Sequence, residues 1–385
     1  MFASFSYHNP VKIVFGKGTI SQLNKLVPAG AKVMITYGGG SIFKNGVYDQ
    51  VKKALNGFEV VEFGGIEPNP TYETLMKAVE IAKKENVTFL LAVGGGSVLD
   101  GTKFIAAAIP YEGEDPWQIV LDRKNYKTAL PLGSVLTLPA TGSEMNYYAV
   151  ISRTETKEKK GMGGPLLYPQ FSILDPETTY TLPTQQVANG IADAFTHVME
   201  QYMTYPVDAQ VQDRMAEGIL QTLIDIAPDA LAKTDDYASR ANFMWAATMA
   251  LNGLLAVGVP TDWATHQIGH ELTALHGIDH ARTLAVVLPH LLKHQLANKE
   301  AKLVQYGTRV WGLQGEPNDV ALQAIEKTAA FYESLGIPTK ASAYGIGLET
   351  VTEVKARFEE RGMNFGERAT ITPDAVEEIL TASIA

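Results

Sequence analysis

The sequence predicts an α/β domain followed by an all-helical domain, and three observations support this expectation. The first half alternates short apolar runs with amphipathic stretches, which is typical of parallel strands joined by crossover helices. Two of the apolar runs end in Gly-Gly-Gly-Ser, a sequence that favours tight turns at strand ends. After about residue 180 the strand-like runs largely vanish and helical periodicity dominates. We therefore expect an α/β domain with a parallel sheet over residues 1–179 and an all-α domain over residues 180–385.

The first half should build its sheet from apolar runs that are bounded by turn residues. Strands are expected at 32–37, 58–63, 87–93 and 134–138, with a further edge strand at 11–15. Amphipathic helices are expected at 45–55 and 71–85, the second with Thr71 as its N-cap. A third helix should run to residue 108, because Ser97 and Asp100 resemble a capping box.

The second half should consist of helices packed on one another. Helical patterns cover residues 185–202, 207–226, 236–256, 263–276, 282–298, 318–335 and 348–361. The boundary near residues 178–183 carries no Ser-, Gly- or Pro-rich linker, so we expect the two domains to pack tightly.

Composition excludes several classes of protein. The net charge is −10 and no Lys/Arg cluster stands out, which argues against nucleic acid or an anionic membrane as a partner. The chain has 0 cysteines, so it has neither disulfides nor Cys-based metal sites, and a cytoplasmic location fits. The start of the chain lacks the pattern of a signal peptide, and no apolar stretch approaches the ~18–20 residues that span a bilayer.

The two glycine-rich runs are candidates for phosphate binding. Glycine allows backbone N–H groups to approach an anion closely, and the run at 94–97 leads into a helix whose N-terminus carries free N–H donors. A pyrophosphate would fit on Gly95, Gly96 and Ser97. The alternative is a plain strand-to-helix turn without a ligand. The spacing is not G-x-G-x-x-G, so this is not the standard dinucleotide fingerprint.

The first glycine run bears on the kind of dinucleotide. An NAD site normally places an acidic residue near the ribose 2′-hydroxyl. The run Tyr37-Gly-Gly-Gly-Ser41 offers no acid, and its small residues leave room for a 2′-phosphate. Lys159 or Lys160 could add a cation, although on their own these lysines would be read as a solvated hairpin tip. The loop therefore favours NADP(H) over NAD(H).

Histidines and one aspartate form the pattern of a metal site in the helical half. Asp193 and His197 are four residues apart, as are His266 and His270, so each pair shares one helix face; His280 follows. One carboxylate with two or three imidazoles suits a first-row divalent metal. The alternative is an Asp–His hydrogen bond that only joins two helices. Because five candidates exceed the usual four ligands, His270 could be a ligand or a nearby proton carrier.

These motifs together resemble the iron-containing alcohol dehydrogenase family, whose fold is shared with dehydroquinate synthase and glycerol dehydrogenase. The resemblance covers essentially the whole chain. It is carried by Gly94-Gly-Gly-Ser-Val-Leu-Asp100, Pro139-Ala-Thr-Gly-Ser-Glu144, Asp193-x-x-x-His197 and His266-x-x-x-His270-x9-His280. The runs at 37–41 and 63–70 are similar to those of the family's bacterial NADPH-dependent aldehyde reductases and butanol dehydrogenases.

The resemblance implies a set of site residues. One divalent metal, iron or zinc, would be held by four ligands, and His270 would be a proton-relay residue near the nicotinamide. The ligands would be Asp193, His197, His266 and His280. The pocket for the adenosine 2′-phosphate would contain Gly38, Gly39, Ser41 and Lys159; the pyrophosphate and nicotinamide ribose would contact Gly95, Gly96, Ser97 and Asp100; and the walls would include Thr137, Thr141 and Asn146.

The function that follows is reversible, metal-dependent reduction of small aldehydes to primary alcohols by NADPH. The family also implies a homodimer, and residues 11–15 could pair between subunits. Two enzyme alternatives share the fold: an NAD-linked polyol or glycerol-type dehydrogenase, and a lyase of the dehydroquinate synthase type. The lyase is disfavoured because few Lys or Arg residues accompany the histidine motifs. A regulatory dinucleotide-binding module with a structural metal is an alternative outside enzymes.

Overall fold

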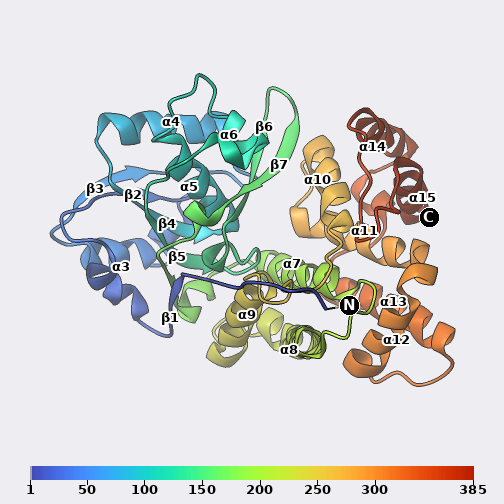
Figure 1. Cartoon of the computed structure of the whole chain (residues 1–385). Coiled ribbons are helices and arrows are strands. Elements are labelled where there is room, and N and C mark those ends of the chain that lie inside the picture. Colours follow the sequence, from blue (N-terminus) through green and yellow to red (C-terminus); the bar gives the residue numbers. More distant parts are fainter. Residues whose placement is uncertain (1) are drawn as a thin grey trace. The chain divides into compact units, whose positions relative to one another are not determined.

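The chain forms two compact units, each described here by itself. The computed structural model describes residues 2–385 (Figure 1). The sheet unit contains His8–Leu182 and Lys233–Thr248. The helical unit contains the N-terminal segment through Tyr7, Pro183–Ala232 and Met249–Ala385. The predicted boundary after residue 179 lies close to Leu182, where the sheet unit first ends. The segment Lys233–Thr248, expected in the helical domain, belongs to the sheet unit, so the division into the two predicted domains stays a prediction.

The sheet unit is built on six parallel strands in the order β1-β8-β5-β4-β2-β3. Their bounds are Lys12–Phe15 for β1, Lys32–Thr36 for β2, Glu59–Phe63 for β3, Phe89–Gly95 for β4, Leu132–Leu138 for β5 and Phe171–Leu174 for β8. The expected α/β class is confirmed. Since β4 and β5 lie at the centre of the sheet, the carboxyl ends of these strands are where a ligand of a parallel sheet is expected.

Helices cover both faces of this sheet, with α4 (Tyr72–Lys84) and α5 (Gly96–Ala108) on one face and α3 (Val47–Ala54) on the other (Figure 1). Side chains alternate accordingly: Leu90 and Ala92 of β4 pack toward α4 and α5, whereas Phe89 and Leu91 pack toward α3. The other helices of this unit are α1 (Leu23–Leu26), α2 (Ser41–Lys44), α6 (Gln118–Leu121) and α9 (Tyr237–Ala250) through Thr248.

Two expectations about helix ends were wrong. Asp100 does not cap α5, because the helix begins at Gly96 and the Asp100 carboxylate accepts instead from Ser143 and from the backbone of Val150. The helix expected at 236–256 ends at Ala250. There Asn252 accepts from the backbone N–H of Leu254, an alternative to helical hydrogen bonding that Asn residues readily supply. Thr71 does cap α4, accepting from the N–H of Thr74.

The sequence pattern predicts neither the two strands of an antiparallel hairpin outside the main sheet nor the strand β8. The hairpin pairs β6 (Tyr148–Arg153) with β7 (Glu158–Gly163). Lys159 and Lys160 lie within β7, opposite Ser152 and Ile151 of β6, rather than at the tip of the hairpin.

The helical unit contains α7 (Thr184–Tyr202), α8 (Gln210–Ala232), α10 (Ala264–His276), α11 (His280–His294), α12 (Leu296–Trp311), α13 (Pro317–Ser334), α14 (Leu348–Glu360) and α15 (Pro373–Ile384). Buried apolar side chains of α10, α11, α14 and α15 form one cluster, which packs α14 and α15 against α10 and α11. Within α7 the run from Val187 to Tyr202 is buried, including its polar members. A buried polar face on a helix requires partners for those groups, which draws attention to α7.

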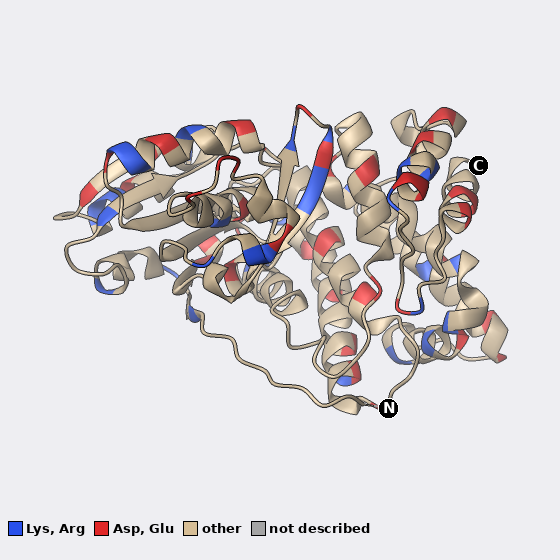
Figure 2. Ribbon diagram, turned by 45° about the horizontal axis from the view of Figure 1, so that its top comes forward, with Lys and Arg blue, Asp and Glu red and all other residues tan. Residues whose placement is uncertain are grey.

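No helix in residues 2–385 is long and apolar enough to cross a membrane. Lys and Arg are interspersed with Asp and Glu along the helices rather than gathered in one patch (Figure 2).

Candidate functional site

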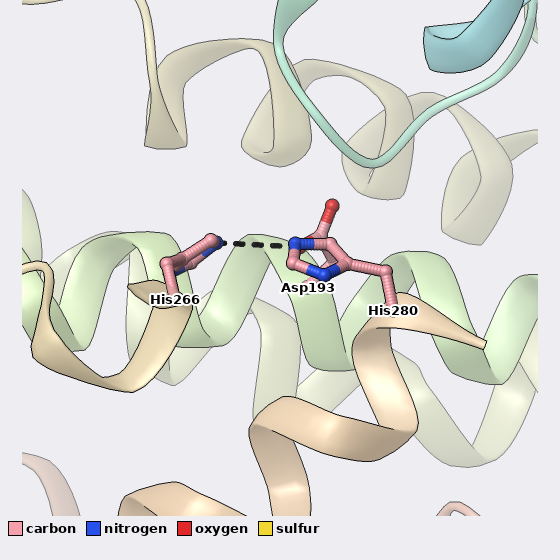
Figure 3. Close-up of side chains that lie close together, drawn as sticks. All are labelled: Asp193, His266 and His280. Atoms are coloured by element: carbon pink, nitrogen blue, oxygen red, sulfur yellow. Dashed lines mark ion pairs between the residues drawn. The ribbon is translucent and has the colours of Figure 1, made fainter. Parts of the chain in front are cut away.

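Three of the expected metal ligands meet in the helical unit. Asp193 of α7, His266 of α10 and His280 of α11 offer ligand atoms that all lie within 4.8 Å of one another (Figure 3). The His266 and His280 Nε2 atoms lie 3.9 and 3.8 Å from Asp193 Oδ1. Ligand atoms bound tetrahedrally to zinc at ~2.1 Å would be about 3.4 Å apart, so these side chains need only small adjustments to share one cation.

His197 adjoins this group from the same helix as Asp193. Its Nε2 atom lies 3.7 Å from Asp193 Oδ1, and its ring stacks on that of His266 at 4.7 Å between centroids. It is not part of the three-residue cluster. Burial lowers the pKa of His197 to about 4, so the imidazole is neutral at physiological pH, which is the form that binds metals.

A cation fits the unsatisfied groups of this cluster. Asp193 is 3% exposed, and its Oδ1 atom has no hydrogen-bond donor among residues 2–385. A buried carboxylate oxygen without a donor is costly unless a cation faces it. With imidazole nitrogens directed at the same oxygen, the donor set of one carboxylate and three histidines suits iron or zinc.

His270 lies beside the cluster rather than in it. It is one helical turn after His266 on α10, is 9% exposed, and its ring centroid is 5.1 Å from that of His280. His270 therefore lies next to the candidate metal centre. Its part in proton transfer stays a prediction.

Two neighbours of the cluster were missed in the sequence. Glu200 contacts His266 Nδ1 and accepts from the His266 backbone N–H at 3.2 Å. Asn189 donates to Asp279, the residue before His280, at 2.9 Å. On α7, Asn189 lies four residues before Asp193 and Glu200 lies three residues after His197, so both share the helix face of the ligands. That spacing alone does not distinguish them from solvated residues. Burial raises the pKa of Glu200 well above its usual value, while the His266 backbone N–H opposes that shift.

In the sheet unit, the junction of β4 and α5 brings backbone amides to the end of the central strand. The strand ends at Gly95 and the helix begins at Gly96, with no side chain capping the first turn. A Cβ on Gly96 would lie 2.5 Å from Thr141, so this glycine is also required by close packing within the protein. Uncapped N–H groups at the N-terminus of a 13-residue helix favour an anion such as a pyrophosphate.

The first glycine run differs from the second. A Cβ on Gly39 would meet nothing within 4 Å, so packing within the chain does not require glycine there. Gly38 faces the backbone of Ile66, and Ser41, the first residue of α2, is exposed. The open space at Gly39 suits the bulk of a ligand group next to the loop.

Lys159 stands near the start of α5 through a chain of contacts. It extends from β7 and donates to Asn69 Oδ1 at 2.8 Å, and the Asn69 backbone N–H donates to Ser97 Oγ at 3.4 Å. The neighbouring Lys160 pairs with Glu158 instead. Of the two lysines, the structure therefore places Lys159 next to a predicted cofactor residue.

Other predicted pocket residues serve a buried network that shapes the loop after β5. Lys103, with 0% exposure, donates to Ser143, Asn146 and the carbonyl of Tyr148. Asp100 accepts from Ser143 at 2.7 Å and from the Val150 backbone. Burial lowers the pKa of Lys103 to about 8 and raises that of Asp100.

This network engages the polar atoms of Asp100 and Asn146 within the protein. Asn146 is 2% exposed and donates to the carbonyl of Thr141, whose hydroxyl accepts from the Ser143 N–H. Thr137 lies in β5 and is 8% exposed. Direct contacts with the cofactor stay predictions for Asp100, Thr137, Thr141 and Asn146. In the structure, the side chains of Asp100 and Asn146 hold the loop after β5 in place.

Two family models match the chain. The model described as "Iron-containing alcohol dehydrogenase" matches residues 10–176, and "Fe-containing alcohol dehydrogenase family, C-terminal" matches residues 187–384.

Curated relatives and solved structures agree with these matches. The chain is 55% identical over 384 residues to the NADPH-dependent aldehyde reductase YqhD of Escherichia coli K12, covering 99% of each chain. It is 43% identical to the probable NADH-dependent butanol dehydrogenase 1 of Bacillus subtilis, covering 99% of this chain and 100% of the relative. The crystal structure of E. coli YqhD aligns with a TM-score of 0.97 at 54% identity and 99% coverage of each chain. NADH-dependent butanol dehydrogenase A from Thermotoga maritima aligns with a TM-score of 0.95 at 38% identity, covering 100% of this chain and 99% of that one.

Proposed function

We propose a function that proceeds from one established point: the chain belongs to the iron-containing alcohol dehydrogenase family. The function is metal-dependent, reversible reduction of small aldehydes to primary alcohols with NADPH. The observation that carries it is the buried Asp193 oxygen, which faces imidazole nitrogens of three histidines and has no hydrogen-bond donor in residues 2–385.

The chain's residues divide the work as follows. Asp193, His197, His266 and His280 would hold one divalent metal, and the uncapped start of α5 would hold the pyrophosphate of the dinucleotide. When bound, the metal supplies a Lewis acid for a carbonyl oxygen and NADPH supplies hydride. An aldehyde becomes an alcohol by gaining hydride at carbon and a proton at oxygen. The His270 imidazole, buried beside His280, is the group proposed to pass that proton.

The preference for NADPH rests on the first glycine run. No carboxylate occupies the run from Tyr37 to Ser41, the space at Gly39 is open, and Lys159 is held close to the start of α5. The relative at 55% identity is named NADPH-dependent, whereas relatives at 42–43% are named NADH-dependent. Because the family includes both NADPH- and NADH-dependent enzymes, family membership does not determine the cofactor. The residues of the first glycine run and Lys159 favour a cofactor with a 2′-phosphate.

The function is tested by mixing metal-loaded protein with NADPH and butanal and following the absorbance of NADPH while butanol is quantified. One NADPH should be consumed for each butanol formed. His294 is a matched control for His266, because it lies in the same unit but pairs with Glu378 away from the cluster. His294→Ala should keep the activity that His266→Ala loses. Absence of NADPH oxidation by metal-loaded wild type would refute the proposed reaction and leave a regulatory module as the better reading.

We also propose that the enzyme is a cytoplasmic homodimer. Its sheet has β1 at one edge, where this strand pairs only with β8 among the strands of the described residues. Phe15 of β1 and Trp245 are 40% exposed each and in edge-to-face contact, so an apolar surface adjoins that edge. The mass in solution, measured by light scattering, should be twice the chain mass of 41.8 kDa. A monomer at micromolar concentration would contradict the dimer, and fractionation of cells tests the compartment.

A further inference from the structure

One face of α7 carries more than the two metal ligands. Asn189, Asp193, His197 and Glu200 follow one another at intervals of 4, 4 and 3 residues, which keeps all four side chains on one side of a helix. All four are buried, with exposures of 8%, 3%, 4% and 2%. Glu200, at the end of this row, has no part in the ligand set described above. A fully buried glutamate on a ligand-bearing face requires an explanation.

Glu200 makes two contacts with a single residue of another helix. Its Oε2 atom contacts His266 Nδ1, and its Oε1 atom accepts from the His266 backbone N–H at 3.2 Å. One carboxylate thus fixes both the backbone and the ring of His266. In its ionised form, which a metal cation at the neighbouring cluster would favour, the Glu200 carboxylate only accepts, so this contact would place the imidazole proton on Nδ1 and direct the Nε2 lone pair at the metal position.

The geometry at the other nitrogen agrees with this assignment. His266 Nε2 lies 3.9 Å from Asp193 Oδ1, on the side of the ring opposite to Glu200. A histidine that donates one ring N–H to a carboxylate while its other nitrogen faces a metal position is the usual arrangement of an oriented histidine ligand.

The loop that leads into His266 is held in the same place by a second set of contacts. The Asp262 N–H donates to the Glu200 carbonyl at 2.9 Å, and Asp262 pairs with the buried Lys299 at 2.7 Å. Trp263, which follows, has a left-handed backbone with φ of 64°, an uncommon conformation for a large side chain. The position of His266 is therefore determined from both its backbone and its ring.

We propose that Glu200 is a positioning residue for the metal centre: it sets the tautomer and direction of His266 and so determines metal affinity and ligand geometry. The inference rests on the metal centre of the proposed function. Glu200 acts through His266 and is not itself a ligand.

The test measures metal binding rather than turnover. Apo-protein is titrated with Co²⁺ against a competing chelator, and the visible absorption of the Co²⁺ form is recorded, in wild type, Glu200→Ala, Glu200→Gln and the control Glu217→Gln. Glu217 is also a buried glutamate of the helical unit, 4% exposed, but it accepts from Tyr202 and Arg309 away from the cluster. The control therefore repeats the chemical change without touching His266.

Glu200→Ala should weaken Co²⁺ binding by about 10–100-fold, the usual effect of losing the partner of a ligand histidine. Its Co²⁺ absorption should also change in band position or intensity. Glu200→Gln, which keeps the shape and an acceptor oxygen, should be weakened less and show a smaller spectral change. Glu217→Gln should stay within about threefold of wild type.

Each outcome decides the inference. Unchanged affinity and spectrum in both Glu200 variants would overturn it, as would an equal loss in Glu217→Gln, which would indicate general destabilisation. If Glu200→Ala does not fold, Glu200→Gln carries the test alone. If wild type binds no Co²⁺, the proposed metal centre itself fails, a result that differs from binding that is insensitive to Glu200.

Discussion

The candidate metal centre and the junction proposed to bind the dinucleotide are built by opposite means. In the helical unit, side chains from α7, α10 and α11 converge on one point, where each residue offers one atom as a metal ligand. In the sheet unit, the junction of β4 and α5 offers backbone N–H groups, and its glycines act by lacking a side chain. A site made of side chains should be destroyed by removing one of them. A site made of backbone amides should bind its ligand more weakly when a glycine gains a side chain. This effect is expected only where neighbouring atoms already fill the space beside that glycine.

The glycines themselves illustrate the second rule. Gly96 faces Thr141 so closely that a Cβ would lie 2.5 Å from it, whereas a Cβ on Gly39 would meet nothing within 4 Å. Close packing against Thr141 requires glycine at 96 whether or not a phosphate binds there. Glycine at 39 is required only if a ligand lies there.

The largest effect is expected from removing a side chain of the metal centre. His266→Ala should lose the metal and lower kcat/KM by ~10³-fold or more, because several kcal/mol of carbonyl activation disappear with the Lewis acid. Metal content by elemental analysis and steady-state kinetics check this. A variant that retains both metal and turnover after exposure to a chelator would remove His266 from the ligand set.

A smaller effect is expected from adding a charge at the open glycine. Gly39→Asp should shift the preference from NADPH toward NADH by ~10–100-fold, since a carboxylate near the 2′-phosphate costs about 1–3 kcal/mol at an intermediate dielectric. The ratio of kcat/KM for the two cofactors measures this shift. Gly39→Asn is the uncharged control, and an unaltered ratio in Gly39→Asp would refute the assignment of the loop.

The contrast between crowded and open glycine gives the next effect. Gly96→Ala should raise the KM for NADPH about tenfold, because a methyl group forced against Thr141 costs about 1–3 kcal/mol and displaces the junction. Gly39→Ala, with free space around its methyl, should change KM by less than about threefold. Equal effects in the two variants would contradict the distinction drawn between the two glycine runs.

The smallest effect concerns the buried Lys103, which belongs to the hydrogen-bond network around the loop after β5. Its pKa in the folded protein is lowered to about 8 from 10.5, so below pH 8 the cost of burying its charge is fully present. As pH rises toward 10.5, the folded protein loses this proton before the unfolded chain does, and the cost is relieved.

Wild type should therefore gain about 1 kcal/mol of stability relative to Lys103→Met between about pH 7 and pH 9. Urea unfolding of both proteins at several pH values measures the difference. A difference that stays constant or falls with pH would show that Lys103 does not titrate in this window.

Much of the fold could be predicted from sequence because its elements are periodic. The strands β2, β3, β4 and β5 are apolar runs bounded by turns, and α7 and α10 carry strong helical patterns. By contrast, β8 has only four residues, the hairpin strand β7 reads Glu-Lys-Lys-Gly-Met-Gly, and the helices α12 and α15 were not recognised. Tertiary pairing, not local preference, determines such segments.

The candidate site divides in the same way. The sequence predicts the four metal ligands because carboxylates and imidazoles bind metals and because helical spacing places them on shared faces; they are Asp193, His197, His266 and His280. Glu200 shares that spacing, but a glutamate on a helix is usually a solvated residue, so only its burial against His266 distinguishes it. Asp100 was misread as a cap since its partners, Ser143 and Val150, are distant in the sequence.

We propose that aldehyde reduction requires one divalent metal held by Asp193 and three histidines. The most direct measurement removes the metal from wild-type protein with a chelator, then restores Fe²⁺ or Zn²⁺ without oxygen while NADPH oxidation by butanal is followed. Activity should fall with metal content and return at about one metal per chain. Full activity in metal-free protein would contradict it.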